Sequence, residues 1–272
     1  MNYRHEFHAG NFADCFKHAL LVSLMNALRL KPAPFCVLDT HAGSGQYDLE
    51  SEAARRTGEA NAGIRRLLDS TDPVLAPYLD LVRAIGLYPG SPRFVQALLR
   101  SEDRLLCCDT LPEAAVSLRR LFRDDRRISV HQRSAWEAVT SLLPPKERRG
   151  LVLIDPPYEA PNEFAQLADG LQQGHRRFGH GVFAAWYPIK QLAAVRAFLD
   201  RMQTQPIRDI ITVELTLREP LDPSRLNGCG LLVINPPYRF ESEAGAIAAA
   251  VLRGLGVTGP GAGSNVIRIT DE

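Results

Sequence analysis

Short apolar runs recur along the chain, and segments with apolar residues at helical spacing separate most of them. The runs predict seven strands, in chain order residues 35–39, 105–108, 128–131, 151–154, 182–186, 209–217 and 230–234. Helices are predicted over residues 14–30, 92–100 and 112–123. Strands that alternate with helices predict an α/β fold with a Rossmann-like, mostly parallel sheet of seven strands. The last two strands are expected to close it as an antiparallel pair.

The stretch 151–158 reads Leu-Val-Leu-Ile-Asp-Pro-Pro-Tyr. Four consecutive branched apolar residues predict a strand that is buried on both faces, as the centre of a parallel sheet requires. Two prolines then end the strand, because they cannot donate ladder hydrogen bonds. Asp155 and Tyr158 are therefore expected at the carboxyl end of the strand, which faces the ligand crevice in an open α/β sheet.

Asp155-Pro156-Pro157-Tyr158 suggests transfer of a methyl group to an exocyclic amine. The N6 amine of adenine is a weak nucleophile because its lone pair is delocalised into the ring, so it needs acceptors for its hydrogens. The Asp155 carboxylate and the Pro156 carbonyl are the candidates, and the ring of Tyr158 is a candidate platform for the base. The alternative is an acidic strand end followed by a proline-rich turn, and the tetrapeptide alone does not decide between them.

The first strand ends at Asp39 and is followed by Thr-His-Ala-Gly-Ser-Gly, residues 40–45. A strand, an acid and a tight glycine turn form the first unit of a nucleotide-binding fold, in which glycines let the backbone approach the ligand closely. The turn is not a complete GxGxxG and lacks the Gly-Lys-Ser/Thr of a phosphate-binding P-loop. A cofactor without a phosphate at this turn fits better, and S-adenosylmethionine is the candidate.

Nucleotide-binding folds place an acid for the ribose hydroxyls at the end of the second strand, about 20 residues later. Here the second strand ends only at Asp109. Residues 47–90 are therefore expected to form an inserted helical subdomain that overhangs the crevice, with helices over 58–68 and 77–85. Residues 1–46 and 91–272 then form the methyltransferase domain with its N-terminal arm.

Several polar residues allow two interpretations each. Lys17 either extends its ammonium to solvent from the end of an apolar stripe or points into the crevice together with His18. Ser91 is expected as the N-cap of the next helix, with Pro92 at its first position, and as a possible cofactor contact. The third strand ends near Ser134 and Ala135, where a turn is placed to border the adenine ring of the cofactor.

A second tetrapeptide, Asn235-Pro236-Pro237-Tyr238, competes with the first. Strand direction separates the two. The strand before Asp155 is expected to run parallel to the first strand, so that its carboxyl end shares an edge with Gly43. The strand before Asn235 is expected to be antiparallel, which takes Asn235 to the opposite edge of the sheet.

Composition and charge exclude several classes. The chain of 272 residues is 45% hydrophobic and 23% charged, which is typical of an ordered globular protein. It contains no apolar run long enough to span a membrane and no recognisable signal peptide, so a cytoplasmic enzyme is expected. A net charge of +1 gives no overall basic field for nucleic acid. The paired arginines are either solvated helix faces or a basic rim around one opening.

Cysteines and histidines give no metal signal. Cysteines 15, 36, 107, 108 and 229 show no CxxC spacing, and Cys36 and Cys107 fall in predicted buried strands, which favours a reducing compartment. The seven histidines form no HExxH motif. A metal site at histidines 5, 8, 18 and 41 lacks acidic residues at supporting spacing, so no metal is predicted.

Several stretches together resemble the RlmJ family, the 23S rRNA (adenine(2030)-N6)-methyltransferases formerly described through the use of external DNA as a nutrient. The matching stretches are residues 3–5, 7–11, 13–14, 17–18, 38–45, 88–92, 149–158 and 186–188. Together they extend over essentially the whole chain, and the N-terminal group is highly specific.

The resemblance implies a monomeric class I methyltransferase that uses S-adenosylmethionine on 23S rRNA that is protein-free or early in assembly. The implied cofactor contacts are His18, His41, Gly43, Ser91, Asp109, Ser134, Ala135 and Asp155. The implied catalytic group consists of Asp155, Pro156 and Tyr158, with Tyr3, Lys17 and Tyr158 on the substrate side. Two positions depart from the family. Asp109 stands where Glu is frequent, and Ser134-Ala135 stands where Asp-Gly is usual, which removes a carboxylate from the cofactor's adenine amine.

Two other functions remain open at this point. A DNA adenine-N6 methyltransferase would use the same chemistry, but the chain shows no separate target-recognition domain. A non-catalytic nucleic-acid-binding protein linked to external DNA would not need both the glycine turn and Asp155-Pro156-Pro157-Tyr158.

Overall fold

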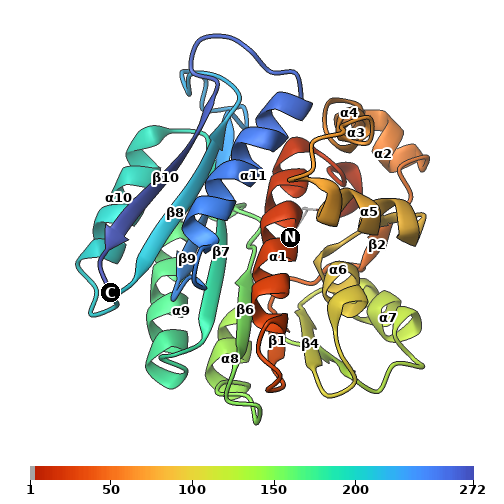
Figure 1. The fold of residues 1–272 in the computed structure, drawn as a ribbon, viewed down its shortest axis with the longest axis vertical. Coiled ribbons are helices and arrows are strands. Elements are labelled where there is room, and N and C mark those ends of the chain that lie inside the picture. Colours follow the sequence, from red (N-terminus) through yellow and green to blue (C-terminus); the bar gives the residue numbers. More distant parts are fainter. Residues whose placement is uncertain (1–3) are drawn as a thin grey trace.

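The computed structural model describes residues 4–272, and within them one mixed sheet of eight strands forms the centre of the molecule (Figure 1). Its strands stand in the order β10-β8-β9-β7-β6-β1-β4-β5. Their bounds are β1 (Cys36–Asp39), β4 (Arg104–Asp109), β5 (Ile128–Gln132), β6 (Gly150–Ile154), β7 (Val182–Ile189), β8 (Ile210–Thr216), β9 (Gly228–Ile234) and β10 (Gly263–Thr270).

All seven predicted strands are present, and the expected directions are confirmed. β5, β4, β1, β6 and β7 run parallel to their neighbours, while β9 lies antiparallel between β7 and β8. The prediction of seven strands is wrong by one, because β10 pairs antiparallel with β8 at the edge. β10 reads Gly-Ser-Asn-Val-Ile-Arg-Ile-Thr and is at most half-buried. An edge strand needs no continuous apolar run, so the pattern gave no signal for it.

β7 is also longer than predicted, since it continues beyond residue 186 to Ile189. Proline usually ends a strand, yet Pro188 lies inside this one. β7 pairs with β6 only as far as Ala185. In the described part of the chain, the residues of β7 after Ala185 pair only with β9, on the other side. Pro188 therefore forfeits no hydrogen bond on that side, as at an edge strand.

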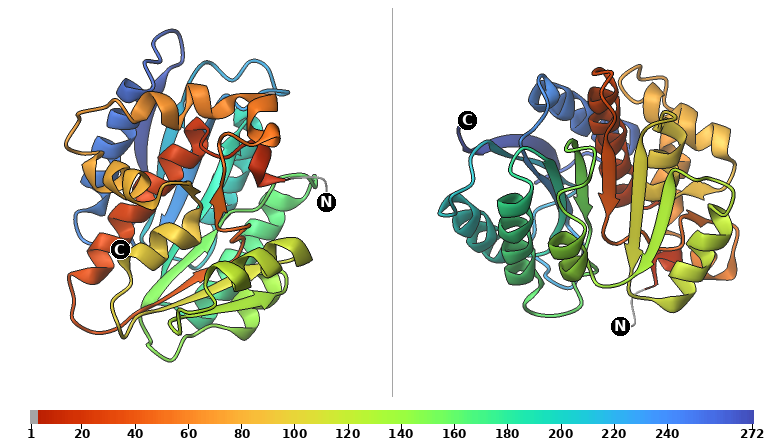
Figure 2. Two further views of the ribbon diagram at one scale, coloured as in Figure 1. Left: turned by 90° about the vertical axis from the view of Figure 1, so that its right-hand side faces the viewer. Right: turned by 90° about the horizontal axis from the view of Figure 1, so that it is seen from below.

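Helices cover both faces of the sheet, as the view from below in Figure 2 shows. The helices outside residues 47–90 are η1 (His5–Phe7), α1 (Phe12–Arg29), α6 (Ser91–Leu98), α7 (Pro112–Leu121), α8 (Ala135–Ser141), α9 (Glu163–Arg177), α10 (Leu192–Gln203) and α11 (Phe240–Gly254). One buried cluster lies between the sheet and α1, α6 and α11, and a second between the sheet and α8, α9 and α10. No helix within residues 4–272 has the length and apolarity needed to cross a membrane.

β6 contributes to both clusters, which confirms the prediction that it is buried on both faces. Leu151 and Leu153 belong to the first cluster, whereas Val152 and Ile154 belong to the second. This alternation follows from the two-residue period of a strand. Because β6 ends at Ile154, Asp155 follows directly after the strand and lies at the carboxyl edge of the sheet.

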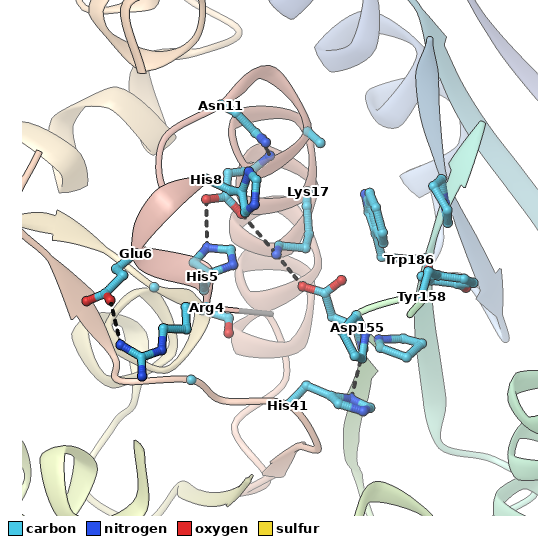
Figure 3. Close-up of a pocket in the computed structure, with 18 of the residues that line it drawn as sticks. Arg4, His5, Glu6, His8, Asn11, Lys17, His41, Asp155, Tyr158 and Trp186 are labelled. Carbon is cyan, nitrogen blue, oxygen red and sulfur yellow. Dashed lines mark hydrogen bonds and ion pairs between the residues drawn. The ribbon is translucent and has the colours of Figure 1, made fainter. Parts of the chain in front are cut away.

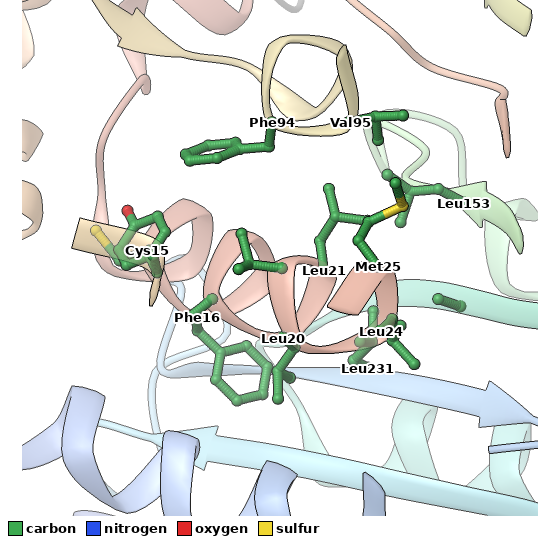
Figure 4. Packing of buried hydrophobic residues seen from close by; sticks show 14 of the residues in the cluster. Cys15, Phe16, Leu20, Leu21, Leu24, Met25, Phe94, Val95, Leu153 and Leu231 are labelled. Atoms are coloured by element: carbon green, nitrogen blue, oxygen red, sulfur yellow. The ribbon is translucent and has the colours of Figure 1, made fainter. Parts of the chain in front are cut away.

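α1 is buried on almost every side (Figure 4). Its apolar residues, among them Leu21 and Met25, pack in one cluster with residues of α6 and of the sheet. The helix begins at Phe12, and its N-cap is Asn11, whose side chain accepts a hydrogen bond from the backbone N–H of Asp14 at 2.9 Å. Asp14 therefore enters the helix and does not cap it. Polar residues on such a helix require partners inside the protein.

Residues between β2 (Gln46–Tyr47) and β3 (Tyr88–Pro89) form α2 (Glu52–Thr57), α3 (Glu59–Ala62), α4 (Ile64–Leu67) and α5 (Ala76–Ile85). The single helix predicted over 58–68 is wrong, because it is interrupted at Gly63. A Cβ atom at Gly63 would lie 2.1 Å from the carbonyl oxygen of Gly10, which also accepts the N–H of Ile64 at 2.8 Å. The division of the chain at residues 47–90 stays a prediction.

Candidate functional site

A cleft of about 1660 Å³ opens at the carboxyl ends of β1, β4 and β6 (Figure 3). It is lined by every predicted site residue that the structure describes, namely Lys17, His18, His41, Gly43, Ser91, Asp109, Ser134, Ala135, Asp155, Pro156 and Tyr158. Tyr3 lies outside the described residues. The structure thus brings these residues together, and their individual roles stay predictions.

Asp155 meets Lys17, which comes from the opposite wall of the cleft. The Lys17 ammonium forms an ion pair with Asp155 Oδ2 and lies 3.1 Å from Asp14 Oδ1. Its side chain is only 6% exposed. Of the two interpretations of Lys17, extension of its ammonium to solvent is therefore wrong. Lys17 points into the crevice and links two carboxylates, as Figure 3 shows.

Asp14 was not predicted as a site residue, yet it anchors the other end of this pair. Its Oδ2 accepts the backbone N–H of Gly10 at 3.0 Å and lies 2.9 Å from His5 Nε2. Burial opposes the charged carboxylate, but His5 and Lys17 together hold the pKa of Asp14 well below its usual range. Asp14 therefore remains an anion inside the protein and keeps Lys17 in place.

His41 lies on the other side of Asp155. The backbone N–H of Asp155 donates to His41 Nδ1 at 3.3 Å, so this nitrogen carries no hydrogen. Burial lowers the pKa of His41 to about 4, although the nearby Asp155 charge opposes this shift. A neutral imidazole at neutral pH thus helps to fix the backbone from which the Asp155 side chain projects.

Asp39, at the end of β1, is completely buried beneath the cleft. Burial raises its pKa to about 7, and the neighbouring Asp155 adds to the rise, while the Ser91 hydroxyl, which donates to Asp39 Oδ2 at 2.6 Å, opposes it. The prediction that Ser91 caps the helix is wrong. Gly90 is the N-cap of α6, and Ser91 is its first residue, because the Ser91 hydroxyl is used by Asp39.

The glycine turn is fixed against Asp109. Gly43 has a φ of +59°, and its N–H donates to Asp109 Oδ2 at 2.9 Å. Asp109 Oδ1 accepts the N–H of Leu111 at the same distance, and burial raises the pKa of the Asp109 carboxyl. A Cβ atom at Gly43 would lie 2.3 Å from the hydroxyl oxygen of Tyr47, so only glycine fits. The acid at the end of β4 and the turn after β1 thus form one wall.

Ser134 and Ala135 form the start of α8, below that wall. Ser134 Oγ accepts the N–H of Glu137 at 3.2 Å, and the Glu137 carboxylate accepts the N–H of Ser134 at 3.3 Å, which is a capping box. The Ser134 hydroxyl is therefore occupied by the helix start.

Tyr158 is held by its neighbours. Its backbone has a φ of +55°, and its hydroxyl donates to the carbonyl oxygen of Trp186 in β7 at 2.9 Å. The ring centroid lies 5.0 Å from that of Phe164 and 5.7 Å from that of Trp186. Trp186 itself lines the cleft, and its buried indole N–H has no hydrogen-bond partner in residues 4–272. The stretch 186–188 matched the family motif, but no role was predicted for Trp186.

The histidines considered for a metal site have other partners. His8 Nδ1 lies 2.8 Å from Glu59 Oε1, and His18 Nδ1 lies 3.1 Å from the Tyr88 hydroxyl. Burial holds the pKa of His18 well below its usual range. Among residues 4–272 no group of three His, Cys, Asp or Glu side chains is arranged to hold a metal ion. All five cysteines are buried free thiols, with Cys36 and Cys107 in strands as predicted.

Asn235 lies away from this cleft. β9 runs antiparallel to β7, and Ile234 pairs with Phe183 near the start of that strand. The Asn235 side-chain amide donates to the carbonyl oxygens of Gly179 and Gly181 at 2.9 and 2.8 Å. The prediction that this tetrapeptide lies at the opposite edge of the sheet is confirmed.

The residues of the cleft fit S-adenosylmethionine. Its sulfonium and ammonium groups are positive, and the carboxyl groups of Asp109 and Asp155 line the cleft at this edge. Asp109 is placed where nucleotide-binding folds hold ribose hydroxyls, and the Gly43 turn lines the cleft beside it.

Comparison with known proteins places the chain among the RNA methyltransferases. The family model described as "Ribosomal RNA large subunit methyltransferase D, RlmJ" matches residues 32–265. Two proteins named "Ribosomal RNA large subunit methyltransferase J" are similar over 89% of this chain and 90% of their own length. The one from Haemophilus influenzae is 38% identical, and the one from Escherichia coli is 37% identical.

Solved structures agree with this family. The crystal structure of a Legionella pneumophila protein matches with a TM-score of 0.87 and 31% identity, covering 96% of this chain and 98% of that one. A probable spermidine synthase from Corynebacterium glutamicum matches with a TM-score of 0.50 at 12% identity, covering 93% of this chain and 74% of that one. The latter likeness shows the fold alone. The α/β fold with a mostly parallel sheet is confirmed, and the methyltransferase family implies S-adenosylmethionine as the methyl donor.

Proposed function

We propose that this chain, which belongs to the RlmJ family of large-subunit ribosomal RNA methyltransferases, methylates the exocyclic N6 amine of one adenine in 23S rRNA. The target is the adenine(2030)-type site, and the substrate is RNA that is protein-free or early in assembly. The enzyme acts as a monomer in the cytoplasm, where ribosomes are assembled.

The observation on which the proposal depends is the position of Asp155. Its carboxylate and the Gly43 turn line one cleft at the same edge of the sheet. A cofactor held at the turn therefore lies next to an acceptor for the hydrogens of an incoming amine. Bound S-adenosylmethionine supplies an electrophilic methyl group on a positive sulfur.

Asp155 and the Pro156 carbonyl accept the two N6 hydrogens of a base that has been flipped out of its stack. This directs the nitrogen lone pair toward the donor methyl group. The ring of Tyr158 stacks on the base, and the bond from its hydroxyl to the Trp186 carbonyl keeps that ring in place. As the nitrogen–carbon bond forms, the carbon–sulfur bond of the donor breaks and leaves S-adenosylhomocysteine, and the N6 proton passes to solvent during or after the transfer.

Lys17 shares Asp155 with the incoming amine. Its ammonium sits between the carboxylates of Asp155 and Asp14, so the amine can take a position on Asp155 while Lys17 keeps its contact with Asp14. Lys17 is therefore proposed on the substrate side of the cleft.

The test is transfer of labelled methyl from S-adenosylmethionine to protein-free 23S rRNA, assembled large subunits, and duplex and single-stranded DNA. Label should appear on naked rRNA as N6-methyladenine. Asp155→Ala should abolish transfer while calorimetry shows cofactor binding within a few-fold of the wild type. Equal loss of transfer and of cofactor binding would contradict the role of Asp155. Label on DNA alone would favour a DNA adenine methyltransferase, and failure to bind the cofactor would favour a non-catalytic nucleic-acid-binding protein.

A further inference from the structure

The side of the cleft beyond Trp186 is basic. Lys190 follows the end of β7, and Arg218 and Arg225 belong to the β8–β9 loop, residues 217–227. All three line the cleft. The carboxyl groups of Asp109 and Asp155 line the same opening at the ends of β4 and β6, whereas the three cations follow β7 and β8.

The completely buried Asn227 stabilises the backbone conformation on this basic side of the cleft. Its side-chain amide donates to the carbonyl oxygens of Asp222, Lys190 and Arg225 at 2.7, 3.2 and 3.2 Å. Its own N–H donates to the carbonyl of Ile189 at 3.0 Å, which ties the loop to β7. One buried side chain therefore fixes the backbone from which two of the cations project.

Within residues 4–272, no carboxylate forms an ion pair with Lys190, Arg218 or Arg225, although many exposed arginines elsewhere have such partners. The loop also contains two acids, Glu219 and Asp222. The Asp222 carboxylate accepts the hydroxyl and the N–H of Ser224 at 2.6 and 2.9 Å, and these bonds, with a smaller contribution from the Arg225 charge, lower the pKa of Asp222. Lys190 and Arg225 are also exposed, so their charges remain available to an anion.

We propose that Lys190, Arg218 and Arg225 bind backbone phosphates of the RNA strand next to the flipped adenine. This inference rests on the proposed function. The acidic side of the cleft suits a cationic cofactor, and the basic side suits a polyanionic strand that enters the same opening. Phosphate contacts set the position of a nucleic acid without reading its sequence. The loop thus places the strand, and Asp155 acts on the base.

The double variant Lys190→Ala/Arg225→Ala tests this inference. The matched control is Lys146→Ala/Arg196→Ala, which removes one exposed lysine and one exposed arginine that do not line the cleft. The measurement is binding of a single-stranded RNA fragment containing the target adenine, as a function of salt concentration. Each lost phosphate contact should reduce the slope of log K against log salt by about 0.7.

We expect the magnitude of that slope to be smaller by about 1.4 in the double variant than in the wild type. The double variant should also bind the RNA at least about tenfold more weakly at low salt. Its affinity for S-adenosylmethionine should be unchanged, and in turnover its KM for RNA should rise more than its kcat falls. A slope equal to that of the control pair would overturn the inference, as would a wild-type protein that does not bind RNA. If the slope changes but the wild type methylates no RNA, the phosphate site stands and the proposed function falls.

Discussion

Asp155-Pro156-Pro157-Tyr158 and Asn235-Pro236-Pro237-Tyr238 follow two buried strands of the same sheet and differ in one residue. The first follows β6, which runs parallel to β1, and so meets the cleft. The second follows β9, which runs antiparallel to β7, and so reaches the opposite edge. The direction of the preceding strand, and not the tetrapeptide, decides which one faces the cleft.

The surroundings of the two tetrapeptides differ accordingly. The Asp155 carboxylate meets an ammonium group that arrives from α1, whereas the Asn235 amide donates to two carbonyl oxygens before β7. Tyr158 packs against Phe164 and Trp186, but Tyr238 is 92% exposed. The acid that pairs with a buried cation lines the cleft, where it can contact a substrate. The amide that donates to two main-chain carbonyls stabilises a turn.

The largest effect is expected from exchanging the two distinguishing residues. Asp155→Asn makes the first tetrapeptide identical to the second and removes the ion pair with Lys17, so methyl transfer should fall about 100-fold or more. Asn235→Asp, the reverse change, should leave transfer within about twofold, measured on the folded protein. Similar losses from both changes would mean that the edge of the sheet does not separate their roles.

The next effect concerns the buried carboxylate beside Asp155. The pKa of Asp39 is raised to about 7, so the folded protein keeps a proton that the unfolded chain releases above about pH 4. The free energy of unfolding should therefore fall as the pH rises through this window, by roughly 2 kcal/mol between pH 5 and pH 7.

Asp39→Asn keeps an acceptor for the Ser91 hydroxyl and removes the titration. Denaturant unfolding at pH 5 and pH 8 should show a smaller pH dependence in this variant than in the wild type. The control is Asp124→Asn, because Asp124 is an exposed acid outside the cleft. Parallel pH dependences in Asp39→Asn and the wild type would contradict the assignment.

A smaller effect is expected at the opposite edge. Asn235→Ala removes two hydrogen bonds to carbonyl oxygens and places alanine at a φ of +53°, in the left-handed region. The free energy of unfolding should fall by about 1–3 kcal/mol, and Tm should fall by several degrees. Methyl transfer well below the Tm should be unchanged, and its loss would show that this edge also serves the reaction.

The smallest effect is expected at Tyr238. Its ring has little contact with the rest of the protein beyond the Arg239 guanidinium, which lies 5.9 Å from the ring centroid. Tyr238→Ala should change the free energy of unfolding by no more than about 0.5 kcal/mol, measured by denaturant titration. Tyr158→Ala, in contrast, should raise the KM for RNA, because the ring proposed to stack on the base is lost.

Local sequence predicted the parts of the fold that depend on continuous apolar runs. The run before Asp155 could only form a strand buried on both faces, and β6 is such a strand. The glycines after Asp39 required a tight turn, and Gly43 has the expected positive φ. β10 was missed because an edge strand is half-exposed and needs no such run.

Residues whose partners lie far along the chain were predicted less well. Ser91 has the residue type of a helix cap, but its hydroxyl is used by Asp39, which lies 52 positions earlier. Gly63 interrupts a helix because the backbone of Gly10 passes close to it. In both cases the local pattern was compatible with the prediction, and a contact from a distant segment changed the outcome.

The sequence by itself determined which residues are apolar, where strands end, and that an acid and a glycine turn stand at strand ends. It also determined family membership, because the matching motifs are local. Only the tertiary structure decided that Lys17 meets Asp155, 138 positions later, because periodicity on α1 does not show what packs against each face. A buried charge is stable only beside its partner, and that partner is fixed by how strands and helices are arranged in space.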